Sequence, residues 1–289
     1  MRTLLCCIGR KENQYIREFV EYYKTLGFTH IRLYDNNFDG EDDFHDVIGD
    51  YIDDGYVTVV DYRNRNICQV QAYEECYAEL KNDYDWFAFF DCDEFLTFVN
   101  PDIKTIDLAL SDSRFDNYDL IHINWMMYDD NDLVKNDGRP VLERFTRPMT
   151  PFTKKTWHMM YSENNFIKSI VRGGLPDIRF KSSVTPINVD KCCDPEGNKT
   201  NGAFPVNHIN YNYMYLRHFS DKTTEEFINK MERGFPDQPH RIPNFIFFFN
   251  SRFFRMNEPT KEKLDYIKER TGVDLFRFYP HLINEQTEK

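Results

Sequence analysis

Residues 86–96 read WFAFFDCDEFL: five apolar residues, typical of a buried strand, are followed at once by acids. The acids are Asp91, Asp93 and Glu94, and an isolated carboxylate is costly to bury. Asp91 and Asp93 lie two residues apart at the strand end, so both can reach one hard cation such as Mg²⁺ or Mn²⁺. The alternative is a solvated strand end whose acids cap the turn.

The residues before this stretch alternate between the hydrophobic periods of strands and helices. We expect strands over residues 3–8, 29–34, 56–60 and 86–90, and helices whose apolar positions span residues 16–26, 44–52 and 73–80. Such alternation implies right-handed crossovers, which predicts an α/β fold with a mainly parallel sheet. Ligands of these sheets bind beyond the carboxyl ends of the strands.

Polar residues follow three of the expected strand ends, at residues 10–13, 35–40 and 91–94. Asp35 or Asn36 can hydrogen-bond a base or a ribose there, or can simply form a turn. Residues 35–46 also match the ligand positions of an EF-hand loop in part. A strand precedes them where an EF-hand has a helix, so we interpret this match as accidental.

After residue 100 the hydrophobic runs become shorter and prolines interrupt them. We expect strands over residues 119–125, 141–146, 166–171 and 208–219, loops through much of 126–207, and helices over 223–233 and 260–271. His218, at a strand end, can give a nitrogen ligand to the cation, and Lys222 can place a positive charge on a phosphate. Lys168 and Arg172 are further phosphate candidates, unless they only face solvent.

Composition excludes several classes of protein. The 289 residues include 36 Lys and Arg against 48 Asp and Glu, and a net charge of −12 disfavours nucleic-acid binding. Seven irregularly spaced cysteines predict free thiols in a reducing compartment, so we expect a cytoplasmic protein. No run reaches the roughly 20 apolar residues of a membrane span. The Phe-rich residues 245–249 should be buried, and a peripheral contact at the inner membrane face is the alternative.

Motifs of other enzyme classes are missing. The sequence contains no GxxxxGKS/T, GxGxxG or GxSxG. A phosphatase motif would need a hydroxyl or small side chain where Phe95 stands. No pair of histidines has the spacing of a zinc site, and no cysteine has the local signature of a nucleophile.

Several segments, taken in order, resemble one known family. They are CIGRKEN (7–13), EFVEYY (18–23), LGF (26–28), YDNN (34–37), FDCDEF (90–95), KSIV (168–171), HFSDK (218–222) and KMERG (230–234). These are similar to motifs of glycosyltransferases of family 92 and of related family 2-like proteins. Phe38 and Phe219 depart from the pattern, since relatives usually carry Ser at the first position and many carry Tyr at the second.

The resemblance implies a single GT-A-like domain over residues 1–289, an α/β/α sandwich. It implies a nucleotide-binding half over 1–100, an acceptor half over 101–240 and a C-terminal helical extension over 241–289. By the same resemblance, a set of metal ligands holds Mn²⁺ or Mg²⁺ against the donor diphosphate, and a second set lies near the nucleoside. The metal ligands are Asp91, Asp93 and His218, and the nucleoside residues are Arg10, Glu12 and Asp35, with Asn36 beside them.

The function expected from this pattern is transfer of a sugar from a nucleotide-sugar donor to a glycan or glycolipid acceptor, as in polysaccharide biosynthesis. Lys168 or Lys222 would stabilise the leaving diphosphate together with the cation. If the enzyme inverts, a carboxylate must accept the acceptor proton, and Asp129 and Asp130 are the candidates. A nucleotide-sugar or glycan-binding module without turnover is the main alternative. A metal-dependent phosphohydrolase is a third hypothesis, but it lacks a nucleophile.

Overall fold

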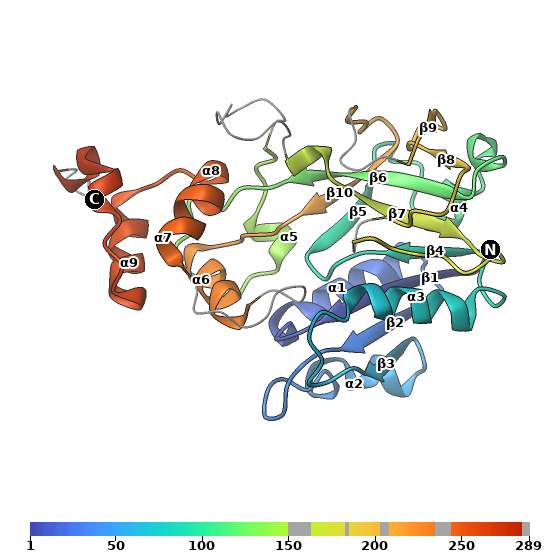
Figure 1. Ribbon diagram of the computed structural model, residues 1–289, viewed down its shortest axis with the longest axis horizontal. Coiled ribbons are helices and arrows are strands. Elements are labelled where there is room, and N and C mark those ends of the chain that lie inside the picture. The colour runs from blue at the N-terminus through green and yellow to red at the C-terminus, as the bar shows by residue number, and fades with distance from the viewer. Residues whose placement is uncertain (150–162, 183–184, 203–207, 235–243, 285–289) are drawn as a thin grey trace. The chain divides into compact units, whose positions relative to one another are not determined.

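Residues 1–100 fold as an alternation of strands and helices in the computed structural model (Figure 1). The elements are β1 (Thr3–Gly9), α1 (Asn13–Thr25), β2 (His30–Asp35), α2 (His45–Asp53), β3 (Val57–Asp61), α3 (Gln69–Leu80), β4 (Trp86–Phe89) and β5 (Glu94–Phe98). The first four strands are parallel, in the order β3-β2-β1-β4. The predicted α/β class with a mainly parallel sheet in this half is therefore confirmed.

The structure describes residues 1–149, 163–182, 185–202, 208–234 and 244–284. The chain divides into two compact units. Unit 1 comprises Met1–Met126 and Met160–His218, and unit 2 comprises Met127–Met159 and Phe219–Lys289.

Unit 1 continues the sheet with antiparallel strands. Its further elements are α4 (Ile106–Leu110), the 3₁₀ helices η1 (Ser113–Phe115) and η2 (Glu163–Asn165), β6 (Leu120–Met127, whose last residue belongs to unit 2), β7 (Ile167–Arg172), β8 (Cys192–Cys193), β9 (Lys199–Thr200) and β10 (Met214–His218). The sheet order is β3-β2-β1-β4-β7-β6-β10-β5, and β8 and β9 extend from β6. β7 is antiparallel to β4 and β6, and β10 is antiparallel to β5.

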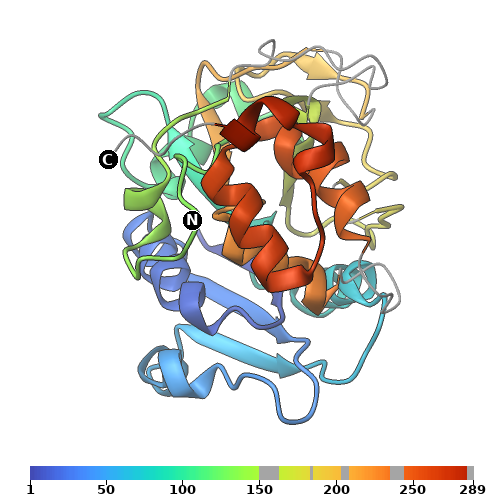
Figure 2. The same cartoon turned by 90° about the vertical axis from the view of Figure 1, so that its left-hand side faces the viewer.

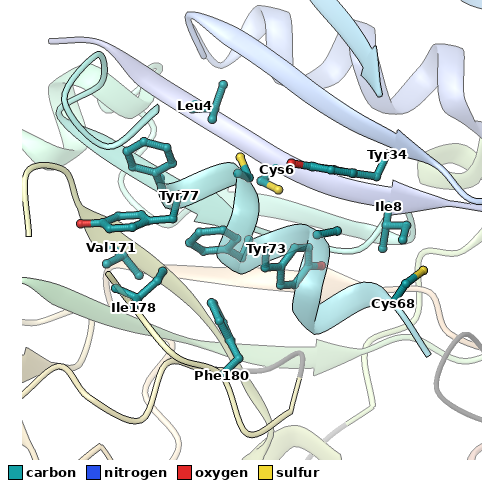
Figure 3. Close-up of a cluster of buried hydrophobic side chains, with 14 of the residues drawn as sticks. Leu4, Cys6, Ile8, Tyr34, Cys68, Tyr73, Tyr77, Val171, Ile178 and Phe180 are labelled. Carbon is teal, nitrogen blue, oxygen red and sulfur yellow. The ribbon is translucent and has the colours of Figure 1, made fainter. Parts of the chain in front are cut away.

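One core of unit 1 lies between α3 and the sheet. Side chains alternate along a strand, so Leu4, Cys6 and Ile8 of β1 share one face. Tyr73 and Tyr77 of α3 pack on that face, as Figure 3 shows, and all five side chains are buried. Right-handed crossovers with this strand order place α1 and α2 on the opposite face.

Unit 2 is mainly helical (Figure 2). Its elements are α5 (Val141–Arg144), α6 (Thr224–Arg233), α7 (Phe245–Phe248), the π-helix η3 (Phe249–Phe253), α8 (Phe254–Met256), α9 (Lys261–Thr271) and the 3₁₀ helices η4 (Phe276–Phe278) and η5 (Pro280–Asn284). Phe227, Phe249 and Phe253 are fully buried in its core. Phe247 is 59% exposed, so the Phe-rich segment is only partly buried, in contrast to the expectation. None of the described helices is both long and apolar enough to cross a membrane.

Two strand predictions in the second half were inaccurate. Val141–Arg144 form helix α5 where a strand over 141–146 was expected, and Val141 and the extended C-cap Phe145 are both buried. The six-residue run is too short for periodicity to separate the two structures. The strand expected over 208–219 is reduced to β10, and β5 was not predicted.

Candidate active site

The register of β5 and β10 brings His218 to the acidic stretch. The two strands pair so that His218 lies opposite Glu94, the residue that follows Asp93. His218 Nε2 is 3.5 Å from Asp93 Oδ1, and these side chains are 8% and 14% exposed. An imidazole and a carboxylate, predicted from distant parts of the sequence to act together, are therefore neighbours.

The carboxylate of Asp91 is held by three donors that converge on one oxygen. Gln69 Nε2 lies 2.7 Å from Asp91 Oδ1, the Tyr73 hydroxyl 3.1 Å and the Lys168 ammonium 2.8 Å. Lys168 reaches this point because β7 pairs with β4, whose end precedes Asp91. The Asp91 side chain is 32% exposed, whereas that of Lys168 is 1% exposed.

Lys168 is a buried counter-ion in this structure. Burial alone would lower its pKa, but the carboxylates of Asp91 and Glu94 outweigh that effect and raise the pKa above its ordinary value. The ammonium therefore stays charged, 3.9 Å from Glu94 Oε1 as well as close to Asp91. Because it is enclosed by protein, Lys168 is poorly placed for the phosphate contact expected from the sequence.

Glu94 stabilises the turn that carries the two aspartates. Its Oε2 accepts a hydrogen bond of 2.9 Å from the Asp91 amide, and its side chain is fully buried. Burial raises the pKa of Glu94 well above the usual range. The Tyr23 hydroxyl of α1 donates to the Glu94 carbonyl and accepts from the Leu96 amide, which attaches the start of β5 to α1.

The donor set at this turn is compatible with a hard divalent cation. Carboxylate oxygens and an imidazole nitrogen are ligands that Mn²⁺ accepts, and a nucleotide diphosphate and water could complete the shell. Within the described ranges, no group of three His, Cys, Asp or Glu side chains is arranged to hold a metal ion. In the structure His218 Nε2 lies beside Asp93 Oδ1, and Asp91 Oδ1 lies beside the Lys168 ammonium.

The expected nucleoside residues gather at the ends of β1 and β2. Gly9 pairs with Asp35, and Glu12 precedes α1 beside them. Asp35 Oδ2 lies 2.7 Å from Arg63 Nε, and its Oδ1 accepts from the Asn37 amide. These bonds leave Asp35 as an anchor of its loop, and they argue against the EF-hand alternative.

Asn36 and Arg10 also have partners within the protein. Asn36 is buried, and its side-chain amide donates to the carbonyls of Tyr62 and Arg65. Arg10 binds Glu41 through two hydrogen bonds of 2.7 and 2.8 Å. The Arg10 guanidinium lowers the pKa of Glu41 to about 2. Arg10 and Asn36 therefore lie at the ends of β1 and β2, where nucleoside-binding residues were expected, and their side chains hold the loops there in place.

The remaining candidates belong to unit 2. Asp130 forms a fully buried ion pair with Lys263, with 2.6 Å between Oδ2 and Nζ, and burial raises the pKa of Asp130 to about 6. Asp129 is 22% exposed and pairs with Arg147 at 2.9 Å. Lys222 is buried with a left-handed φ of 56°, directly before the N-cap of α6.

Sequence reasoning missed the residues that surround Asp91. The sequence carries no motif at Gln69, and the periodicity of residues 73–80 indicates only the apolar face of a helix for Tyr73. Their i, i+4 spacing places both on one face of α3. No local pattern indicates that Gln69 and Tyr73 contact Asp91, because this contact depends on how α3 packs on the sheet.

An α/β fold with acidic residues and a histidine at the ends of its strands is compatible with a nucleotide-sugar transferase. The chain belongs to glycosyltransferase family 92, whose model matches residues 3–246. A comparison with curated protein sequences finds no match.

Among solved structures, the chain is similar to Staphylococcus aureus TarS 1–349, with 14% identity and a TM-score of 0.43. That match covers 81% of this chain and 64% of the TarS chain. It is also similar to the mannosyltransferase PcManGT from Pyrobaculum calidifontis, solved with GDP-Man and Mn²⁺. There the identity is 13%, the TM-score 0.32, and the match covers 42% of this chain and 35% of the other.

Proposed function

We propose that this family 92 protein is a metal-dependent glycosyltransferase that moves a sugar from a nucleotide-sugar donor to a glycan acceptor. The observation that carries the proposal is the approach of His218 Nε2 to Asp93 Oδ1, 3.5 Å apart, at the turn that also presents Asp91. Asp91, Asp93 and His218 would hold Mn²⁺ or Mg²⁺. The bound cation would neutralise charge that develops on the leaving diphosphate.

The protein's own groups have separate tasks in this proposal. Asp93 and His218 bind the cation, and Glu94 keeps the turn between the strands in place. Arg10 and the loop anchored by Asp35 border the nucleoside. A buried side chain cannot reach an acceptor hydroxyl, so the fully buried Asp130 is a poor general base. If the reaction inverts the sugar, we propose Asp129 as the base.

We also propose a reducing, cytoplasmic setting. All seven cysteines are free and buried in the structure. Structural disulfides are rare in the cytosol, so free thiols are expected there.

The proposal is tested by measuring donor turnover with added Mn²⁺ and with a chelator, using a panel of nucleotide-sugars and glycans. Asp93→Asn removes a ligand charge while keeping the side-chain volume, and it should lower Mn²⁺-dependent turnover by about 100-fold or more, the lower end of the range for lost electrostatic stabilisation being about 100-fold. Asp83→Asn is the matched control, because Asp83 is exposed just before β4. That variant should keep full activity.

Two outcomes would contradict the proposal. Full turnover in the presence of chelator would remove the metal from the mechanism. Donor binding by calorimetry, without transfer or hydrolysis across the panel, would identify a nucleotide-sugar-binding module.

A further inference from the structure

The donors around Asp91 all bind Oδ1 of its carboxylate, and none of them binds Oδ2. Among the residues that the structure describes, the hydrogen bonds and ion pair of this side chain go to Oδ1, and Oδ2 takes none. Gln69 also donates to the Tyr73 hydroxyl at 3.0 Å, so the hydroxyl proton is directed to Asp91. The carboxylate cannot turn without breaking several bonds together.

We infer that Gln69 and Tyr73 are positioning residues. Together with Lys168 they hold Oδ1 of Asp91, so that this carboxylate contributes Oδ2 to the cation that Asp93 and His218 also bind. This inference rests on the proposed function, since it assigns roles around the same metal site. Carboxylates that bind metal through one oxygen depend on partners that orient the other oxygen. The predicted consequence is that neutral substitutions on α3 change metal affinity without changing the charge of the site.

The test uses two substitutions that remove a donor and leave the charge unchanged. Gln69→Leu removes the amide, and Tyr73→Phe removes the hydroxyl. Free Mn²⁺ is measured by electron paramagnetic resonance during titration with the full-length protein, with Mn²⁺ alone and with Mn²⁺ plus UDP or GDP. We expect each variant to bind Mn²⁺ about 10-fold more weakly, the lower end of the range for ligand-orienting groups.

The same helix supplies matched controls. Gln71 donates to Glu75 at 2.7 Å on α3, so Gln71→Leu loses a comparable bond to a carboxylate. Tyr77 is fully buried one turn after Tyr73 and donates to the Arg172 carbonyl at 2.7 Å. Gln71→Leu and Tyr77→Phe should keep the Mn²⁺ affinity of the wild type, even where the thermal midpoint falls.

The outcomes separate this inference from the proposed function. If the wild type binds Mn²⁺ and the Gln69 and Tyr73 variants bind it equally well, the positioning role is wrong and the metal site stands. If the Tyr77 control weakens Mn²⁺ binding as much as Tyr73→Phe, the effect is general loss of structure and the inference is overturned. If the wild type binds no Mn²⁺ under either condition, both fall.

Discussion

The ammonium group of Lys168 lies between two carboxylates that depend on it. Nζ is 2.8 Å from Asp91 Oδ1 and 3.9 Å from Glu94 Oε1, and the side chain is almost completely buried. Removing one partner of a buried ion pair leaves the other charge uncompensated, at a cost of about 3–5 kcal/mol. Lys168→Met should therefore lower the free energy of unfolding by that amount, as measured by urea denaturation.

The control for this substitution is Lys199→Met, because Lys199 is exposed on β9. An exposed lysine should change the free energy of unfolding by less than about 0.5 kcal/mol. A Lys168→Met protein of normal stability with a raised KM for the donor would contradict the structural role. That result would restore the phosphate contact expected from the sequence.

At the scale of elements, α6 is fixed by one buried carboxylate. Glu226 forms a capping box with Thr223, and it binds both terminal nitrogens of Arg144 at 2.8 and 2.9 Å. Both side chains of the ion pair are at most 3% exposed. Arg144→Met should lower the stability of unit 2 by about 3–5 kcal/mol, because the Glu226 charge would remain buried without its partner.

The exposed pair on the same segment provides the comparison. Arg139 binds Asp137 at 2.6 Å, but its side chain is 52% exposed. Arg139→Met should lower the free energy of unfolding much less than Arg144→Met does, since water screens an exposed pair. Chemical denaturation followed by circular dichroism checks both variants. If the two substitutions lowered the free energy of unfolding equally, burial would not determine how much these ion pairs stabilise the protein.

The elements also show what sequence can and cannot predict. The helices and parallel strands of residues 1–100 follow from periodicity and glycine stops, and Asp91 and Asp93 follow from their place after an apolar strand. His218 was a candidate ligand from its place at a strand end, but its approach to Asp93 could not be read from the sequence, because that contact depends on the antiparallel register of β5 and β10. The burial of Lys168 and Asp130 was missed, because their partners are distant in sequence.

At the scale of the whole molecule, each compact unit has its own hydrophobic core. The core of unit 1 surrounds Tyr73 and Tyr77, and that of unit 2 surrounds Phe227 and Phe249. Multidomain chains need not unfold in one step. Whether the single domain expected over residues 1–289 also unfolds in one step can be tested by measuring which amides a ligand protects from hydrogen exchange.

A ligand that binds only the folded protein stabilises it by about 2.7 kcal/mol when present at 100 times its Kd. Donor and Mn²⁺ should therefore slow hydrogen exchange about 100-fold for amides of β1 and β4 that open only on global unfolding. Asp93→Asn should abolish this protection. If the Asp93→Asn protein is still protected by donor and Mn²⁺, the donor binds at another site.

If the two units unfold separately, amides of α6 and α9 should gain less protection from the ligand, and Arg144→Met should speed hydrogen exchange in those helices alone. Equal changes in both units would instead show that residues 1–289 unfold as one cooperative domain.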